Sequence, residues 1–112
     1  MKGRNTVAWI ALVIAGLLEV GWATAMKLSD GFSRLGPSIA TIVLMILSFG
    51  MLSYSMRSLP LGTAYTVWTG IGAIGSVLVG IVVMGESKDP VRLLCLLLIL
   101  SGIVGLKLAS PE

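Results

Sequence analysis

Charged residues are so sparse in this sequence that they divide it into long uncharged runs. Twenty-two uncharged residues separate Arg34 from Arg57, and twenty-eight more separate Arg57 from Glu86. Of the 112 residues, 56% are hydrophobic and 12% are charged, whereas a soluble domain carries about 25% charged residues. A helix needs roughly 20 mostly apolar residues to cross a bilayer. The runs therefore favour an integral membrane protein.

Turn-forming residues fall between the apolar runs. They lie at Asp30-Gly31, Gly36-Pro37, Pro60-Leu61-Gly62 and from Gly85 to Pro90. The sequence predicts an all-α membrane protein, with one four-helix transmembrane domain over residues 1–112. Its helices are expected at about 6–27, 36–56, 61–84 and 91–108. The start of the first run loosely resembles a cleavable signal peptide, but an acid at Glu19 is unusual beside a cleavage site.

Composition also excludes several classes of function. The net charge of +3 comes from eight scattered Lys and Arg with no basic stripe, which disfavours nucleic-acid binding. Cys95 is the single cysteine, so no disulfide can form within the chain. Histidine is absent, which removes the commonest metal ligand and general base. We therefore expect no catalytic residues, no metal and no cofactor, and so not an enzyme.

The positive charges leave the orientation in the membrane open. One face would carry Lys2, Arg4, Arg57 and Lys107, and the other Lys27, Arg34, Lys88 and Arg92. Positive charge normally favours the cytoplasmic side, and here the bias is zero. Either one of these charges has no influence on orientation, or copies of the chain insert in both orientations and pair antiparallel.

One acid, Glu19, lies near the middle of the first span. Insertion scales put a central acid at roughly +2.5 to +3.5 kcal/mol, a cost that a structural role does not require. Desolvation disfavours its charged form, so the carboxyl is suited to exchanging a proton for a cationic ligand. The structural alternative is a protonated acid that bonds neighbouring helices.

Residues around Glu19 favour a binding site. Gly16 and Trp22 lie three residues either side of it, on the same helix face, where Gly16 opens space and Trp22 offers an indole donor. Aromatic walls around a carboxylate suit a cation. Further candidates are Tyr65, Trp68 and Thr69 on one face of the third span, and Ser48 on a polar line of the second with Ser38, Thr41 and Ser55. Trp9 is expected to be an interfacial belt residue.

Small residues on the later spans suggest hinges or contacts. Gly70 and Gly72 lie in mid-span, where glycines mark a kink or allow close packing. Stripes of small residues favour helix association, on the third span at Gly72, Ser76 and Gly80, and on the fourth at Ser101, Gly105 and Ala109.

Four motifs make the sequence recognisable as a whole. They are AGLLEVGWATAMK from Ala15, GFSRL from Gly31, SLPLGTAYTVWTGIG from Ser58 and GIVGLKL from Gly102. From about Val7 to Ala109 the chain resembles the small multidrug resistance family of four-helix, proton-coupled cation exporters. Trp22, Ser48 and the Gly-Leu-Lys ending resemble its guanidinium-exporting subtype.

The resemblance implies an antiparallel, dual-topology homodimer that crosses the bacterial inner membrane several times. Glu19 of both subunits would form one shared site, which binds substrate or protons in turn. Carried over by position, Trp22, Ser48, Tyr65 and Trp68 would line that site. Gly70 and Gly72 would form a hinge, and the fourth helix would supply dimer contacts, at Ser101, Gly102 and Gly105.

The function expected on this basis is proton-coupled antiport of guanidinium or a small guanidinyl cation. Guanidinium is planar and matches a carboxylate in a two-pronged pair. The partners are then the cation, protons, membrane lipid and a second copy of the chain. One alternative is a broader exporter of small quaternary ammonium compounds. Another is a non-transporting membrane subunit that stabilises a partner.

Overall fold

The computed structural model describes the backbone of residues 2–109 and the side chains of residues 6–109. Lys2 and Arg4, which enter the charge count, fall outside the described side chains. The described chain forms four helices: α1 (Lys2–Leu28), α2 (Leu35–Ser55), α3 (Leu61–Met84) and α4 (Pro90–Ala109). Each is long and apolar enough to cross a membrane, so the prediction of four apolar helices in an all-α fold is confirmed.

The helices begin and end within one residue of the predicted spans, except that α1 begins four residues earlier. The signals at their ends are local. Gly85 adopts a left-handed conformation (φ 71°) and ends α3, with the Glu86 N–H donating to the Gly80 carbonyl at 3.0 Å. Asp89 then accepts a hydrogen bond from the Val91 N–H at 2.9 Å and caps the start of α4.

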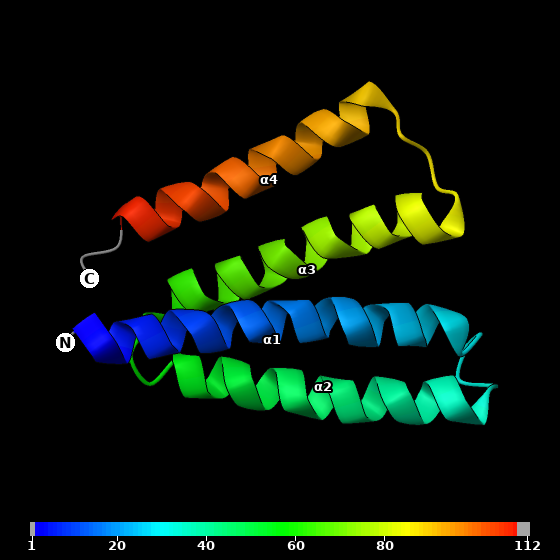
Figure 1. Cartoon of the computed structure of the whole chain (residues 1–112), viewed down its shortest axis with the longest axis horizontal. Helices are drawn as coiled ribbons and strands as arrows, with labels where there is room; N and C mark the ends of the chain where they lie inside the picture. The colour runs from blue at the N-terminus through cyan, green and yellow to red at the C-terminus, as the bar shows by residue number, and fades with distance from the viewer. Residues whose placement is uncertain (1, 110–112) are drawn as a thin grey trace.

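The helices form a flat layer and do not close into a bundle (Figure 1). The principal extents are 45 × 34 × 18 Å. Helix α1 packs against α2 and α3, whereas the backbone of α4 lies beside α3, and the Lys107 side chain of α4 reaches Trp9 of α1. Much of α4 is exposed, and Leu96 is its one buried residue among those described. Figure 1 shows the α1–α2 and α3–α4 connections at the same end of the layer.

Hydroxyl residues form the face that α2 turns to α1. Thr41, Ser48 and Ser55 are fully buried at seven-residue spacing, the repeat of a left-handed helix pair. Thr41 and Ser55 donate to carbonyls of their own helix, at 2.8 and 2.7 Å. Ser48 instead donates across to the Ala15 carbonyl of α1 at 2.7 Å. The predicted polar line is therefore largely a close-packing surface, and Ser48 is its interhelical member.

Glycines form the seams on either side of α3. At Gly16 of α1, an added Cβ would lie 2.6 Å from Cγ2 and 2.7 Å from Cβ of Ile71. At Gly70 of α3, it would lie 2.7 Å from Cδ1 of Ile103 on α4. Such contacts bring helix backbones close together, and close packing drives association in lipid. The space that Gly16 opens is filled by Ile71.

Trp9 departs from its expected place at the lipid interface. Its side chain is 8% exposed and belongs to the hydrophobic core, with Leu12 and Val67. The Nζ atom of Lys107 lies 4.6 Å from the centre of its ring. The prediction of a lipid-facing belt residue is therefore wrong, because α3 and α4 cover this part of α1.

The Gly16–Ile71 contact predicts a stability difference between two glycine substitutions. Gly16→Ala should lower the free energy of unfolding by about 1–3 kcal/mol, since its methyl group overpacks a rigid β-branched neighbour. Gly50→Ala is the control, because a methyl group there meets no described atom within 4 Å. It should raise stability by about 0.5 kcal/mol through helix propensity. Unfolding in detergent measures both, and equal effects would contradict this packing.

Candidate cation-binding site

Glu19 lies in the middle of α1, where its carboxylate packs directly against Gly72 of α3. A Cβ at Gly72 would overlap the carboxylate, so this position has to be glycine for Glu19 to lie as it does. Oxygen Oε1 of Glu19 is buried and has no hydrogen-bond partner among the described residues. Leaving a buried acceptor unpaired costs about 1–3 kcal/mol, and more when it is charged. The carboxylate is therefore available to a ligand.

Trp22 supplies a second unpaired polar group one helical turn away. Its Nε1 atom is buried and also has no partner in the described part of the chain. The indole N–H is a donor only, and the carboxylate is an acceptor when ionised. An unpaired donor and an unpaired acceptor thus lie three residues apart on one face of α1.

Ser48 joins three helices beside this pair. Its hydroxyl donates to the Ala15 carbonyl of α1 at 2.7 Å and accepts from the Trp68 Nε1 of α3 at 3.0 Å. Both bonds are buried, and Trp68 is 7% exposed. The Ser48 hydroxyl donates one hydrogen bond and accepts another, and both bonds are directional. It therefore fixes the position of the Trp68 indole relative to α1 and α2.

Four aromatic rings form a row from α1 through α2 to α3. The ring centres of Trp22 and Phe49 are 6.3 Å apart, those of Phe49 and Trp68 5.6 Å, and those of Trp68 and Tyr65 5.7 Å. These are distances of interacting aromatic pairs. Tyr65 is 53% exposed and Phe49 48%, so the row has an open side.

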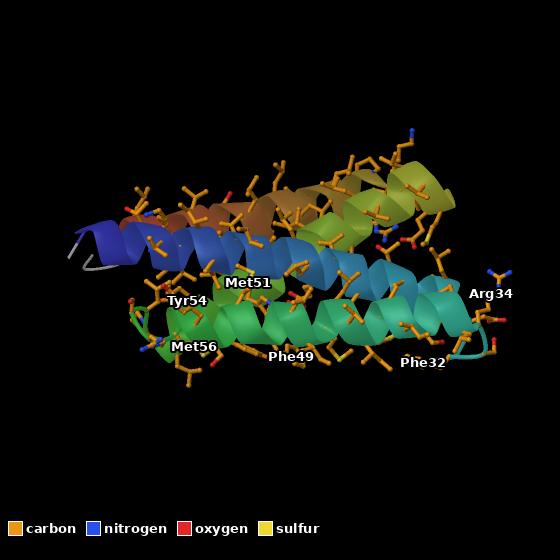
Figure 2. The ribbon with its side chains drawn as sticks, turned by 60° about the horizontal axis from the view of Figure 1, so that its bottom comes forward. Phe32, Arg34, Phe49, Met51, Tyr54 and Met56 are labelled. Carbon is orange, nitrogen blue, oxygen red and sulfur yellow. The ribbon has the colours of Figure 1, made fainter. Side chains whose placement is uncertain are left out.

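Phe49 was not expected at the site. Figure 2 places it part-way along α2, between Tyr54 and Met56 near one end and Phe32 and Arg34 at the other. The one sequence signal for Phe49 is that it directly follows Ser48, a residue of the polar line. Its role in joining Trp22 to Trp68 depends on the relative placement of three helices, which helical periodicity does not give.

Other predicted site residues lie farther from the carboxylate. Gly16 packs on Ile71, as described above. Thr69 is exposed and lines a groove of about 510 Å³ between α3 and α4, together with Tyr65 and Gly102. Helix α3 is continuous through Gly70 and Gly72, which accommodate Ile103 and Glu19 respectively. Their action as a hinge stays a prediction.

The predicted contact residues of α4 are all exposed. Ser101 donates to the Leu97 carbonyl of its own helix at 2.7 Å. A Cβ at Gly102 or Gly105 would meet no atom within 4 Å in the described part of the chain. These positions therefore leave a smooth helix surface uncovered, and their contact with a second copy stays a prediction.

The electrostatics of the site suit a cation. Among the described residues no Lys or Arg forms an ion pair with Glu19. Toward the α1–α2 loop, the next cationic residue on α1 is Lys27, eight residues or about 12 Å along the helix. A carboxylate flanked by indole rings attracts a cation both by charge and through the ring faces. Ring contacts and one hydrogen bond thus link Trp22, Ser48, Trp68 and Tyr65 across three helices, and Glu19 lies one helical turn from Trp22 on α1.

Comparisons with known proteins agree in covering nearly the whole chain. Residues 7–99 match the model of the family described as Small Multidrug Resistance protein. The guanidinium exporter of Yersinia pseudotuberculosis is 64% identical over 104 residues, which is 93% of this chain and 100% of that protein. The guanidinium exporters of Salmonella typhimurium and Escherichia coli are 60% and 58% identical, each over 93% of this chain and 99% of their own length.

The Ser48 hydroxyl predicts a measurable contribution to stability. Ser48→Ala should lower the free energy of unfolding by about 1 kcal/mol, because it leaves the Trp68 indole N–H and the Ala15 carbonyl without that bond. Ser55→Ala is the matched control, since its hydroxyl bonds a carbonyl of its own helix alone among the described groups. Unfolding in detergent, followed by tryptophan fluorescence, compares the two. Equal losses would show that the link between helices contributes nothing.

Proposed function

Because the chain belongs to the small multidrug resistance family, we propose that it is a guanidinium exporter of the bacterial inner membrane. It works by antiport, exchanging guanidinium for protons. The observation that carries the proposal is the pair of unpaired buried groups, the Glu19 carboxylate oxygen and the Trp22 indole N–H. The names of three relatives as guanidinium exporters support the choice of cation.

The chemistry of guanidinium matches what this site offers. Its N–H donors form a planar fork, which pairs with the two oxygens of a carboxylate. Its flat faces stack on aromatic rings, and Trp22, Phe49 and Trp68 supply such rings around Glu19. The Trp22 N–H has no partner among the described residues, so it is a donor available on the same face of α1 as the carboxylate. Ser48 fixes the indole of Trp68 at the wall of the site.

Exchange follows from competition for one carboxylate. A proton and a guanidinium both neutralise Glu19, and the membrane interior disfavours leaving it charged and empty. Binding of one therefore expels the other. Opening of the occupied site to alternate sides of the membrane converts this competition into antiport.

A second, antiparallel copy completes the site. The single chain is a flat layer whose aromatic row is open on one side, and α4 leaves Ser101, Gly102 and Gly105 uncovered. The equal numbers of positive charges on the two faces allow insertion in both orientations. In the dimer the two Glu19 carboxylates share one cation, with Gly70 and Gly72 as the flexible point of α3.

Export of small quaternary ammonium compounds is the second candidate, and the aromatic row favours it. Such cations cannot donate hydrogen bonds, so they would rely on Trp22, Trp68 and Tyr65 alone. They would leave the Glu19 oxygen without a hydrogen bond, which makes them the poorer match.

The competition mechanism predicts how guanidinium binding depends on pH. The group that titrates is Glu19, which binds the cation when ionised and is blocked when protonated. As pH falls through its titration range, the apparent Kd for guanidinium should rise by up to about tenfold per pH unit. Fluorescence of Trp22 and Trp68 in detergent measures this. A Kd that stays constant from acidic to alkaline pH would refute competition at this carboxylate.

Glu19→Gln separates a transporter from a structural subunit. The variant should fold and pair but lose proton-driven guanidinium flux in proteoliposomes, because the amide neither binds the cation nor exchanges a proton. Crosslinking or size analysis checks that the dimer is intact. Normal flux in this variant would favour the non-transporting subunit.

Comparison of two cations tests the substrate. Proteoliposomes with a proton gradient should take up guanidinium at least about tenfold better than tetramethylammonium, the difference of one well-placed charged hydrogen bond. Preference for tetramethylammonium would instead support the quaternary ammonium exporter.

A further inference from the structure

A small polar cavity lies between α1 and α3, on the side of Glu19 that faces the α3–α4 loop. Its volume is about 150 Å³, and Ala23 and Ser76 line its deeper part. Each of these residues is four positions, or about one helical turn, beyond the contact of Glu19 with Gly72. The cavity therefore begins one turn from the proposed binding carboxylate.

Polar side chains continue along the cavity to its mouth. Thr24, Lys27 and Glu86 line it, and the Thr24 hydroxyl donates to the Val20 carbonyl at 2.8 Å. Space for several waters is present at about 30 Å³ each. Val79 and Met84 form the apolar part of the lining, and Glu86 is the carboxylate at the mouth.

The backbone aims Glu86 at this mouth. The left-handed Gly85 turns the chain back, and the Glu86 N–H bonds the Gly80 carbonyl at 3.0 Å. The Glu86 carboxylate consequently lies over Gly80, where an added Cβ would be 2.5 Å from its carbon. Gly80 thus makes room for a loop acid to lie against α3.

The partner of Glu86 is itself a guanidinium group. Arg92 of α4 places Nη2 2.6 Å from Oε1 of Glu86 and Nη1 3.1 Å from the Ser87 carbonyl oxygen. Both side chains are partly exposed, at 41% for Glu86 and 32% for Arg92. An exposed pair of this kind contributes about 0–1 kcal/mol, so opening the Glu86–Arg92 pair costs little.

We propose that Glu86 and the Ser87 carbonyl form a second, peripheral site for a guanidinium cation, at the mouth of the cavity whose inner end lies one helical turn from Glu19. Arg92 occupies this site when it is empty of substrate and is displaced when the cation arrives. Lys27 lines the same cavity and repels cations, which keeps the site weak and lets the cation leave it. The inference rests on the proposed function, because it takes guanidinium as the substrate.

Nuclear magnetic resonance of Arg92 tests the site directly. The protein is labelled with ¹⁵N, kept in its full form in lipid or detergent, and carries Glu19→Gln to remove the inner site. Guanidinium chloride should shift the Arg92 side-chain signals along a saturating curve. Sodium chloride and tetramethylammonium chloride at equal ionic strength should not. Shifts that are linear and equal for the three salts would overturn the proposal.

Transport kinetics test the role of the site in substrate entry. Glu86→Gln should raise the KM for guanidinium about threefold at low salt and leave kcat unchanged, with a smaller effect at high salt. Asp89→Asn is the matched control, because it removes the same charge from the same loop, does not line the cavity, and retains a side-chain oxygen for the α4 cap. A KM that changes equally in both variants would overturn the peripheral site.

A double variant separates binding by the carboxylate from repulsion by an unpaired Arg92. Glu86→Gln with Arg92→Gln removes one negative and one positive charge, so the net charge of the chain is unchanged. The KM should still be raised, whereas a return to the wild-type value would assign the effect to Arg92 and overturn the proposal. If the wild type transports no guanidinium, the proposed function fails as well. If it does and these variants behave as their controls, the peripheral site fails alone.

Discussion

The structure depends on one carboxylate in an apolar span that has no partner within the described chain. A central acid costs roughly 2.5 to 3.5 kcal/mol on insertion scales, so its neighbours have to be arranged around it. Gly72 gives the Glu19 carboxylate a place against the backbone of α3, and Trp22 faces the same space with an unpaired donor. Ser48 then ties α1, α2 and α3 together beside them with two buried hydrogen bonds.

Two kinds of seam hold the helices around this group, and they differ in what they permit. The α1–α2 seam consists of hydroxyl residues at seven-residue spacing. Thr41 and Ser55 donate their hydroxyl hydrogens to carbonyls of their own helix, so they present small surfaces with no free donor to α1. The seams of α3 consist of glycines that receive Ile71 and Ile103. Since the glycine contacts are held by packing alone, the hydrogen bond from Trp68 to Ser48 is the polar link that ties α3 to α2 among the described residues. Helices α1 and α2 are linked by the bond from Ser48 to the Ala15 carbonyl.

The sequence predicted the spans well because charge is so scarce that each charged residue marks a boundary. It also placed Glu19 and Trp22 on one face, since helical periodicity alone determines neighbours within a helix. It did not predict that Phe49 joins the aromatic row, that Thr69 faces the α3–α4 groove or that Trp9 is buried. Each of these depends on how one helix is rotated relative to another. For the same reason it could say that Gly16 opens space, but not that Ile71 fills it.

Under the proposed function, the same chemical pair, carboxylate and guanidinium, would have different strength at Glu86 and at Glu19. At Glu86 water screens the charges, so the pair with Arg92 is weak and can exchange. At Glu19 the surroundings are apolar, and an attraction between charges that is about 1 kcal/mol at 4 Å in water grows several-fold. Under the proposed function, a guanidinium that moves inward would exchange a screened carboxylate for an unscreened one, and the stronger attraction at Glu19 has to offset the cost of removing both charges from water.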